Sequence, residues 1–248
     1  MRLRDKWRHR ATVAMLRSSP VLVAGTGTTS STVDSYVKQW SPDATRRSDT
    51  VLVVDQPFEL CGPFDFDESL WFAAKLPPEC RSAYALPEPD DRPANGQGDF
   101  ELTAIFLLNG LARRTRGRRR ISPTGTFDAA WDETPATVLH LPGALSSEEA
   151  MSVLAVHLPG LHTTPGSSHT LDSDDVGVDI APEYPWRGFP LLRAQPWFTS
   201  TADTTQCRFL PDAGRGPEAG DRASAAARAL AVARGGLVLD DDGFPDQL

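Results

Sequence analysis

A glycine-containing turn near the start of the chain has the residue types that hold a phosphate group. Gly25, Gly27 and Ser30 form the pattern GxGxxS. They follow the short β-branched run 21–24, and a later run of the same kind ends at Asp55. In dinucleotide-binding units, the amides of such a turn bind a pyrophosphate at a helix N-terminus, and the acidic residue binds the ribose. Because Ser30 replaces the third glycine, the turn is equally typical of a polar linker, and nucleotide binding is an alternative interpretation.

The densest group of potential metal ligands lies in the second half of the chain. It contains His157, His162 and His169, with several aspartates close behind. Imidazole nitrogens and carboxylate oxygens bind zinc or iron when they converge with an open coordination position. The spacing matches neither HExxH nor HxH, and the Ser/Gly-rich segment between the histidines is typical of a solvent-exposed loop. The three histidines are therefore candidate metal ligands, and no residue is assigned a catalytic role.

A run of basic residues follows the middle of the chain. It places six arginines within eight residues: Arg113, Arg114, Arg116, Arg118, Arg119 and Arg120. Guanidinium groups can hold phosphates through bidentate contacts, and cations also complement the exposed carbonyl groups at a helix C-terminus. The net charge of the chain is -8 and no aromatic RNA-binding pattern accompanies the run. An acidic protein surface is therefore at least as good a partner for it as nucleic acid.

The composition is that of a globular protein. Of the 248 residues, 40% are hydrophobic and 23% are charged, which excludes wholesale disorder. Cys61, Cys80 and Cys207 are too few and too scattered for a disulfide framework, which favours the cytoplasm. No apolar run is long enough to span a membrane, and Arg17 and Pro20 interrupt the stretch that resembles a signal peptide. We therefore expect no membrane partner, and the sequence implies no cofactor.

The second half of the chain, residues 137–245, predicts a ferredoxin-like β-α-β-β-α-β unit and hence an α+β fold class. Its first helix begins at a capping box that starts with Ser146, and its second helix ends at Gly235. The expected elements are a strand at 137–141, a helix at 147–158, strands at 176–181 and 189–199, a helix at 221–234 and a strand at 237–239.

The first half echoes this order in reduced form over residues 49–128. The expected elements are a strand at 51–54, helices at 65–76 and 99–116, and a poor final strand at 118–121. Gly117 and Gly125 bracket that strand as Gly235 and Gly243 bracket the last strand of the chain. The pattern is compatible with a duplication in reduced form, and one continuous α+β domain with a mixed sheet is an equally open alternative. Residues 1–48 are assigned to a basic, partly disordered arm.

Since no motif is complete enough for catalysis, the sequence favours a non-catalytic binding or interaction protein over an enzyme. The basic run 113–120 and the aromatic segment 184–198 are the expected contact surfaces. A nucleotide-dependent protein or enzyme that uses the Gly25–Gly27 turn is one alternative, and nucleic-acid contact through the arginine run is another. The sequence leaves the oligomeric state open.

Overall fold

The computed structural model describes residues 3–90, 97–129, 136–165, 167, 169–182, 189–198, 204–212 and 217–245. The chain divides into two compact units, Met1–Glu133 and Thr134–Leu248, and each is described by itself. Over the described ranges, seven helices accompany two antiparallel sheets of seven and six strands. The α+β class expected from the sequence is confirmed.

The first unit is built on the seven-stranded sheet. Its elements are, in chain order, α1 (Leu3–Ser18), β1 (Val21–Ala24), α2 (Ser30–Trp40), β2 (Thr45–Ser48), β3 (Val51–Asp55), β4 (Phe58–Asp65), α3 (Glu68–Ala74), β5 (Ser82–Ala85), α4 (Gln97–Thr115), β6 (Arg118–Arg120) and β7 (Asp128–Ala129). The strand order is β2-β3-β4-β5-β1-β6-β7, and β1 pairs with β5 on one side and with β6 on the other. All four residues of β1 are fully buried, so this short apolar strand is the centre of the unit.

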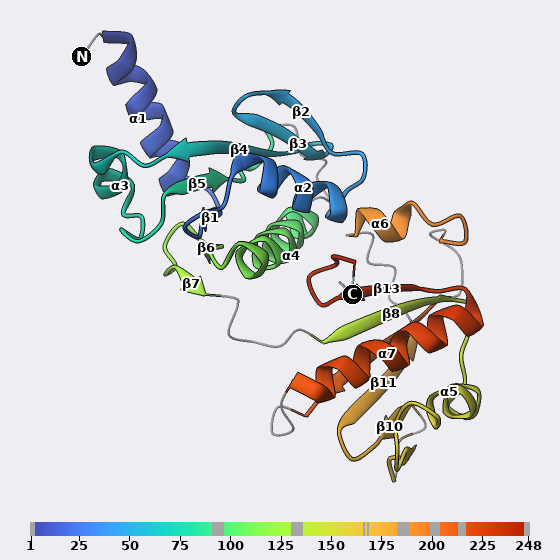
Figure 1. Cartoon of the computed structure of the whole chain (residues 1–248). Helices are drawn as coiled ribbons and strands as arrows, with labels where there is room; N and C mark the ends of the chain where they lie inside the picture. The colour runs from blue at the N-terminus through green and yellow to red at the C-terminus, as the bar shows by residue number, and fades with distance from the viewer. Residues whose placement is uncertain are drawn as a thin grey trace. The chain divides into compact units, whose positions relative to one another are not determined.

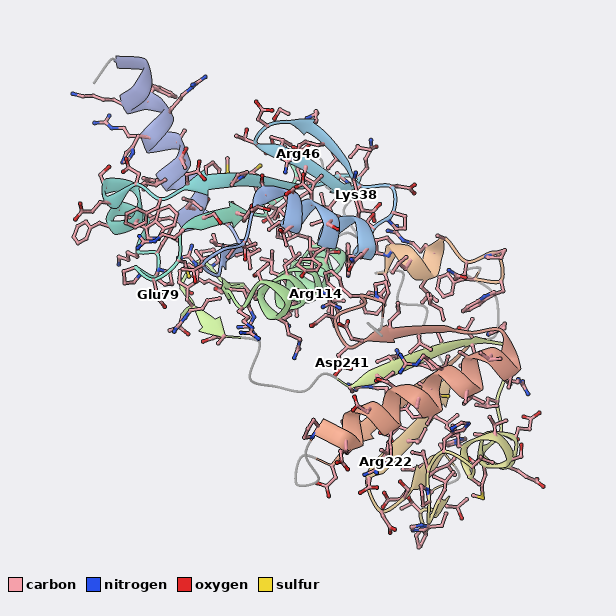
Figure 2. All side chains as sticks on the ribbon, viewed as in Figure 1. Lys38, Arg46, Glu79, Arg114, Arg222 and Asp241 are labelled. Carbon is pink, nitrogen blue, oxygen red and sulfur yellow. The ribbon has the colours of Figure 1, made fainter. Side chains whose placement is uncertain are left out.

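Helices cover both faces of this sheet (Figure 1). Because side chains alternate along a strand, Val21 and Val23 point to one face and Leu22 to the other. The valines join a core with Leu16 of α1 and with residues of α3 and β5. On the other face α4 packs against α2 and β1. Arg46, labelled in Figure 2, donates from Nε to Asp34 Oδ2 at 2.7 Å and ties β2 to α2.

The second unit is built on the six-stranded sheet. Its elements are, in chain order, β8 (Thr137–Pro142), α5 (Ser147–Leu154), β9 (His162–Thr163), β10 (Thr170–Asp172), β11 (Val176–Pro182), α6 (Pro190–Arg193), β12 (Thr204–Pro211), α7 (Pro217–Arg234) and β13 (Leu237–Asp240). The strand order is β13-β8-β12-β11-β10-β9, and every neighbouring pair is antiparallel. Helix α7 lies along β8 (Figure 1). It also packs against β12 and α5. The core between them contains Leu139, Cys207 and Leu230, all fully buried.

Two local signals of the second unit are confirmed. The side chain of Ser146 accepts the amide of Glu149 at 3.2 Å, and the Glu149 carboxylate accepts the amide of Ser146 at 3.0 Å. This capping box satisfies two amides that a helix start leaves open. At the end of α7, Gly235 adopts φ 75°, and the Gly236 amide donates to the carbonyl of Ala231 at 3.0 Å.

The expected strand at 189–199 is wrong. Its start forms α6, in which Pro190 occupies the first turn, where its fixed φ suits a helix and its missing amide costs nothing. The strand that pairs with β8 and β11 is instead β12, which the sequence analysis did not predict. Its first residues, Thr204 to Gln206, are polar, so the alternation of buried Cys207 and exposed Arg208 was too short to stand out.

The segment 1–48, assigned to a basic arm, holds α1, β1, α2 and β2 in the structure. The arm was inferred from the charges of its first residues, which say nothing about Val21–Ala24. That run becomes the central strand, and Val33, Val37 and Trp40 of α2 are fully buried. The first unit therefore begins well before residue 49.

Candidate functional site

Helix α3 is short because its two ends are fixed by local chemistry. Asp67 is the N-cap, and its Oδ1 accepts the amide of Leu70 at 2.8 Å. Lys75 is the C-cap with φ 57°, and the Leu76 amide donates to the Trp71 carbonyl at 3.0 Å. The two prolines that follow prevent a further turn. The helix therefore has only about two turns in which to bury its apolar residues.

One side of α3 packs into the first unit. Leu70, Trp71 and Ala74 are buried in the core that contains Leu16 of α1, and the Trp71 indole donates to the carbonyl of Pro77 at 3.1 Å. Arg17 of α1 donates from Nε to the carbonyl of Ala73 at 2.8 Å, which fixes α1 beside α3. The position of α3 is thus set from two directions.

The other side of α3 leaves an aromatic side chain in solvent. Phe72 is 88% exposed, and Phe66, just before the helix, is 42% exposed. The Phe66 ring lies 5.2 Å from the Trp71 ring, and the Arg81 guanidinium lies 4.5 Å from the centre of the Phe66 ring. Single exposed apolar side chains are common on soluble proteins, but exposed apolar side chains that lie together in one patch mark interaction sites.

These residues line an open groove of about 710 Å³. Its walls are Phe66, Glu68, Trp71, Phe72, Lys75, Leu76 and Pro78. We call these seven residues the α3 surface. Glu68 and Lys75 are both exposed, and they lie at opposite ends of the helix. The α3 surface is therefore a mainly apolar groove with a carboxylate at one end and an ammonium group at the other.

The Gly25–Gly27 turn has a structural role. A Cβ on Gly25 would lie 2.3 Å from the carbonyl oxygen of Thr115 at the end of α4, and the Gly25 amide donates to that same oxygen at 3.2 Å. Gly27 adopts φ 88°, and Ser30 begins α2 after the N-cap Thr29. Glycine is required at position 25 because another part of the chain approaches it.

Asp55 is not brought near this turn. In the register of the sheet, Ala24 pairs with Ser82, at the same end as Asp65. Asp55 pairs with Phe58, which is at the opposite end of β4. Since β5 and β4 also separate β1 from β3, the expected pairing of a pyrophosphate turn with a ribose-binding carboxylate has no geometric basis.

The three candidate histidine ligands are exposed and do not converge. His157 follows α5, His162 lies in the edge strand β9, and His169 precedes β10. His162 Nδ1 is 2.9 Å from the carbonyl oxygen of Gly160. Over the ranges that the structure describes, no three His, Cys, Asp or Glu side chains form a group that could hold a metal ion.

The arginine run is largely directed toward the protein itself. Arg113 and Arg114 lie half-buried in the last turn of α4, and Arg116, with φ 48°, is the exposed member. Arg120 is 5% exposed and donates to the carbonyl of Leu16. Burial lowers the pKa of Arg120.

The remaining two arginines are in ion pairs. Arg118 lies 3.1 Å from Glu79, which Figure 2 labels, and Arg119 lies 3.1 Å from Asp128 of β7. Arg119 also donates from Nε to Asn109 of α4. The run therefore joins β6 to its neighbours through Arg118, Arg119 and Arg120, while Arg116 is exposed to solvent.

The aromatic segment 184–198 is described only in part, since residues 183–188, including Trp186, lie outside the described ranges. Phe189 is buried, with its ring 6.1 Å from the ring of His140. Trp197 and Phe198 are half-buried and make an edge-to-face contact at 6.4 Å. The burial of Phe189 fits core packing and not the expected contact surface.

The α3 surface was missed in the sequence, although one signal was present. Trp71 and Phe72 are adjacent, and adjacent residues on a helix point about 100° apart. In α3 Trp71 is buried and Phe72 is exposed. Which of them is exposed depends on the position of α1, a helix that the sequence pattern does not indicate.

Comparison with protein-family models, with curated proteins and with solved structures finds no match to this chain. Among the helices of the described ranges, none is both long and apolar enough to cross a membrane.

Proposed function

We propose that this chain is a non-catalytic binding protein that contacts a protein partner through the α3 surface. The observation that carries the proposal is the exposure of Phe72 above an apolar groove, on a helix whose other side is anchored by Trp71 and Arg17. Aromatic side chains are enriched in the buried centres of protein–protein contacts, and an apolar groove beside one offers further area to bury.

The positions of the other candidate groups support binding over catalysis. Gly25 and Asp55 lie at opposite ends of the sheet, and the three histidines stay apart. The arginine run was one of the two expected contact surfaces. Its last three arginines instead bind a carbonyl group and two carboxylates of the same unit, which makes the run a poorer candidate for nucleic acid. Cys61, Cys80 and Cys207 are free and buried, which supports a cytoplasmic location.

We also propose that each unit is a ferredoxin-like scaffold, and that the second is a copy of the first. Such a scaffold interleaves two β-α-β halves, so that the fourth strand lies beside the first and the third lies beside the second. In the second unit, β8, β11, β12 and β13 supply this pattern as the order β13-β8-β12-β11. In the first unit, β1, β4, β5 and β6 supply it as the order β6-β1-β5-β4.

The additions to the two scaffolds support the duplication. Two extra strands precede the second scaffold strand in each unit and extend the same edge, as β2 and β3 do beside β4 and as β10 and β9 do beside β11. A short helix, α3 or α6, also follows that strand in each unit. This alignment pairs β1 with β8, in place of the sequence-based pairing of 51–54 with 137–141.

One backbone detail recurs at equivalent places. Gly117 follows α4, and a Cβ there would lie 2.3 Å from the carbonyl oxygen of Val23 in β1. Gly236 follows α7, and a Cβ there would lie 2.6 Å from the carbonyl oxygen of His140 in β8. Each glycine accepts the close approach of the last strand to the first. The proposed copies therefore share a packing constraint as well as a strand order.

Photo-crosslinking in cells that naturally make the protein tests the binding function. A benzoyl-phenylalanine placed at position 72 is expected to give discrete products, identified by mass spectrometry as defined proteins. The matched control is position 232, because Val232 of α7 is similarly exposed (87%) but lies in the other unit. Products at neither position, or the same products at both, would overturn the assignment of the α3 surface.

A further inference from the structure

The α3 surface has a charge pattern that is complementary to itself. Glu68, Phe72 and the C-cap Lys75 form a stripe along the chain, spaced four and three residues apart, and all three line the groove. Glu68 and Lys75 line opposite ends of the groove, and both side chains are exposed. In the part of the chain that the structure describes, neither is in an ion pair with another residue. The stripe thus offers one unpaired charge of each sign with an aromatic ring between them.

We propose that the α3 surface binds a second copy of this chain, with the two α3 helices antiparallel across a two-fold axis. This inference rests on the proposed binding function and names the partner. A two-fold contact requires that residue i meets residue j while j meets i. The midpoint of Glu68 and Lys75 falls between Trp71 and Phe72, so an axis at that point places Glu68 of one copy opposite Lys75 of the other.

The distances along the helix agree with this arrangement. At 1.5 Å per residue, Glu68 and Lys75 lie about 10 Å apart along the axis of α3, so both ion pairs form in one short crossing. The Phe72 rings of the two copies then meet at the axis and shield each other from water. A parallel crossing would instead oppose like charges, which disfavours association.

The partner chemistry follows from the balance of charge. A strongly acidic or strongly basic peptide would leave one end of the α3 surface beside a like charge, whereas a second copy satisfies both ends. The contact is small compared with interfaces that hold stable dimers, so the association is expected to be reversible and concentration-dependent.

Sedimentation velocity of the full chain over a range of concentrations tests the proposal. The wild-type chain is expected to shift from monomer to dimer as concentration rises. Glu68→Lys and Lys75→Glu each place like charges opposite one another and are expected to weaken the dimer about tenfold or more. The double variant restores opposite charges and is expected to recover most of the wild-type affinity. Phe72→Ser is expected to abolish the dimer, and Val232→Ser serves as the matched control.

A single charge reversal that folds poorly would also lose the dimer. The double variant carries both substitutions, so a far-ultraviolet circular dichroism spectrum like that of the wild type shows that neither substitution prevents folding. A chain that stays monomeric at all concentrations, or a double variant no better than either single one, overturns the dimer. Failure of the dimer is distinguishable from failure of the binding function. Crosslinks from position 72 to a different protein would contradict this inference alone, whereas an absence of crosslinks together with a monomeric chain would contradict both.

Discussion

Arg120 of β6 donates a hydrogen bond to the carbonyl oxygen of Leu16, which lies in the last part of α1. The guanidinium also lies 4.9 Å over the ring of Phe127. A residue of the basic run, which the sequence predicts to be a contact surface, therefore joins the first helix to β6, the strand next to the central β1. The position of α1 decides in turn which side of α3 is buried, since Arg17 of α1 contacts Ala73.

Arg120→Met is expected to lower the free energy of unfolding by about 1–3 kcal/mol. The substitution leaves the Leu16 carbonyl without its charged donor and removes the contact with Phe127. Urea denaturation measures the loss, and limited proteolysis should show earlier cleavage within α1. Arg116→Met is the matched control, because Arg116 is exposed, and it should change stability by no more than about 0.5 kcal/mol. Equal effects of the two substitutions would show that Arg120 has no anchoring role.

Gly117→Ala and Gly236→Ala are each expected to destabilise the chain by about 1–3 kcal/mol, because the added Cβ would overlap a carbonyl oxygen of the neighbouring strand. Gly143→Ala is the control. Gly143 adopts φ 77° but has open space around it, so only the backbone strain of about 1–2 kcal/mol applies. Thermal and urea unfolding of the three variants should separate packing overlap from strain. A Gly236→Ala variant as stable as wild type would remove this support for the duplication.

Tyr84 gives the first unit a dependence on alkaline pH. Burial raises its pKa to about 12, with Asp34 adding to the rise and Arg46 opposing it. An unfolded tyrosine titrates near 10, so the folded state holds this proton more tightly. The stabilisation is complete below pH 10 and is lost as pH rises from about 10 to 12, by about 2–3 kcal/mol.

Tyr84→Phe is therefore expected to flatten the fall in stability between pH 10 and 12, as measured by urea unfolding at several pH values. Burial also raises the pKa of Cys207 to about 12, so part of the fall will remain in the variant. Cys207→Ala in the same series separates the two contributions. Identical pH profiles for wild type and Tyr84→Phe would contradict the burial of this hydroxyl.

The capping box gives α5 a dependence on acidic pH. Hydrogen bonds from the Ser146 amide, the Ser146 hydroxyl and Arg234 hold the pKa of Glu149 below its usual value. A lowered carboxyl pKa contributes stability that is present above the unfolded pKa and is lost as pH falls through the folded pKa. Glu149→Gln should flatten this acid-side slope, whereas the neighbouring Glu148→Gln should leave it unchanged. Ser146→Ala should cost about 1 kcal/mol at neutral pH.

Elements with strong local signals were predictable from the sequence. The capping box at Ser146, the glycine end of α7 and the apolar run of β8 each depend on a few neighbouring residues, and all three are present. Strands without an apolar run were not predictable. Strand β2 is Thr-Arg-Arg-Ser, and it forms because it pairs with β3 at the edge of the sheet. The sequence of β2 contains no apolar run or alternation that would predict a strand.

The candidate site could not be predicted from the sequence for a similar reason. Whether Arg120 is buried, and whether Phe72 is exposed, depends on where α1 lies, and α1 is a basic helix without a clear apolar stripe. Histidines and glycines that resemble site residues were judged by type and spacing. Their positions depend on strand direction, which fixed Asp55 at the wrong end of the sheet for a nucleotide.

The central position of β1 has a consequence for synthesis on the ribosome. Val21–Ala24 is translated about 60 residues before its partner β5 and about 100 residues before its partner β6. At about 5–20 residues per second, the strand waits several seconds as an unpaired apolar segment. The strand is enclosed on both sides only after Arg120, the last residue of β6, has been translated.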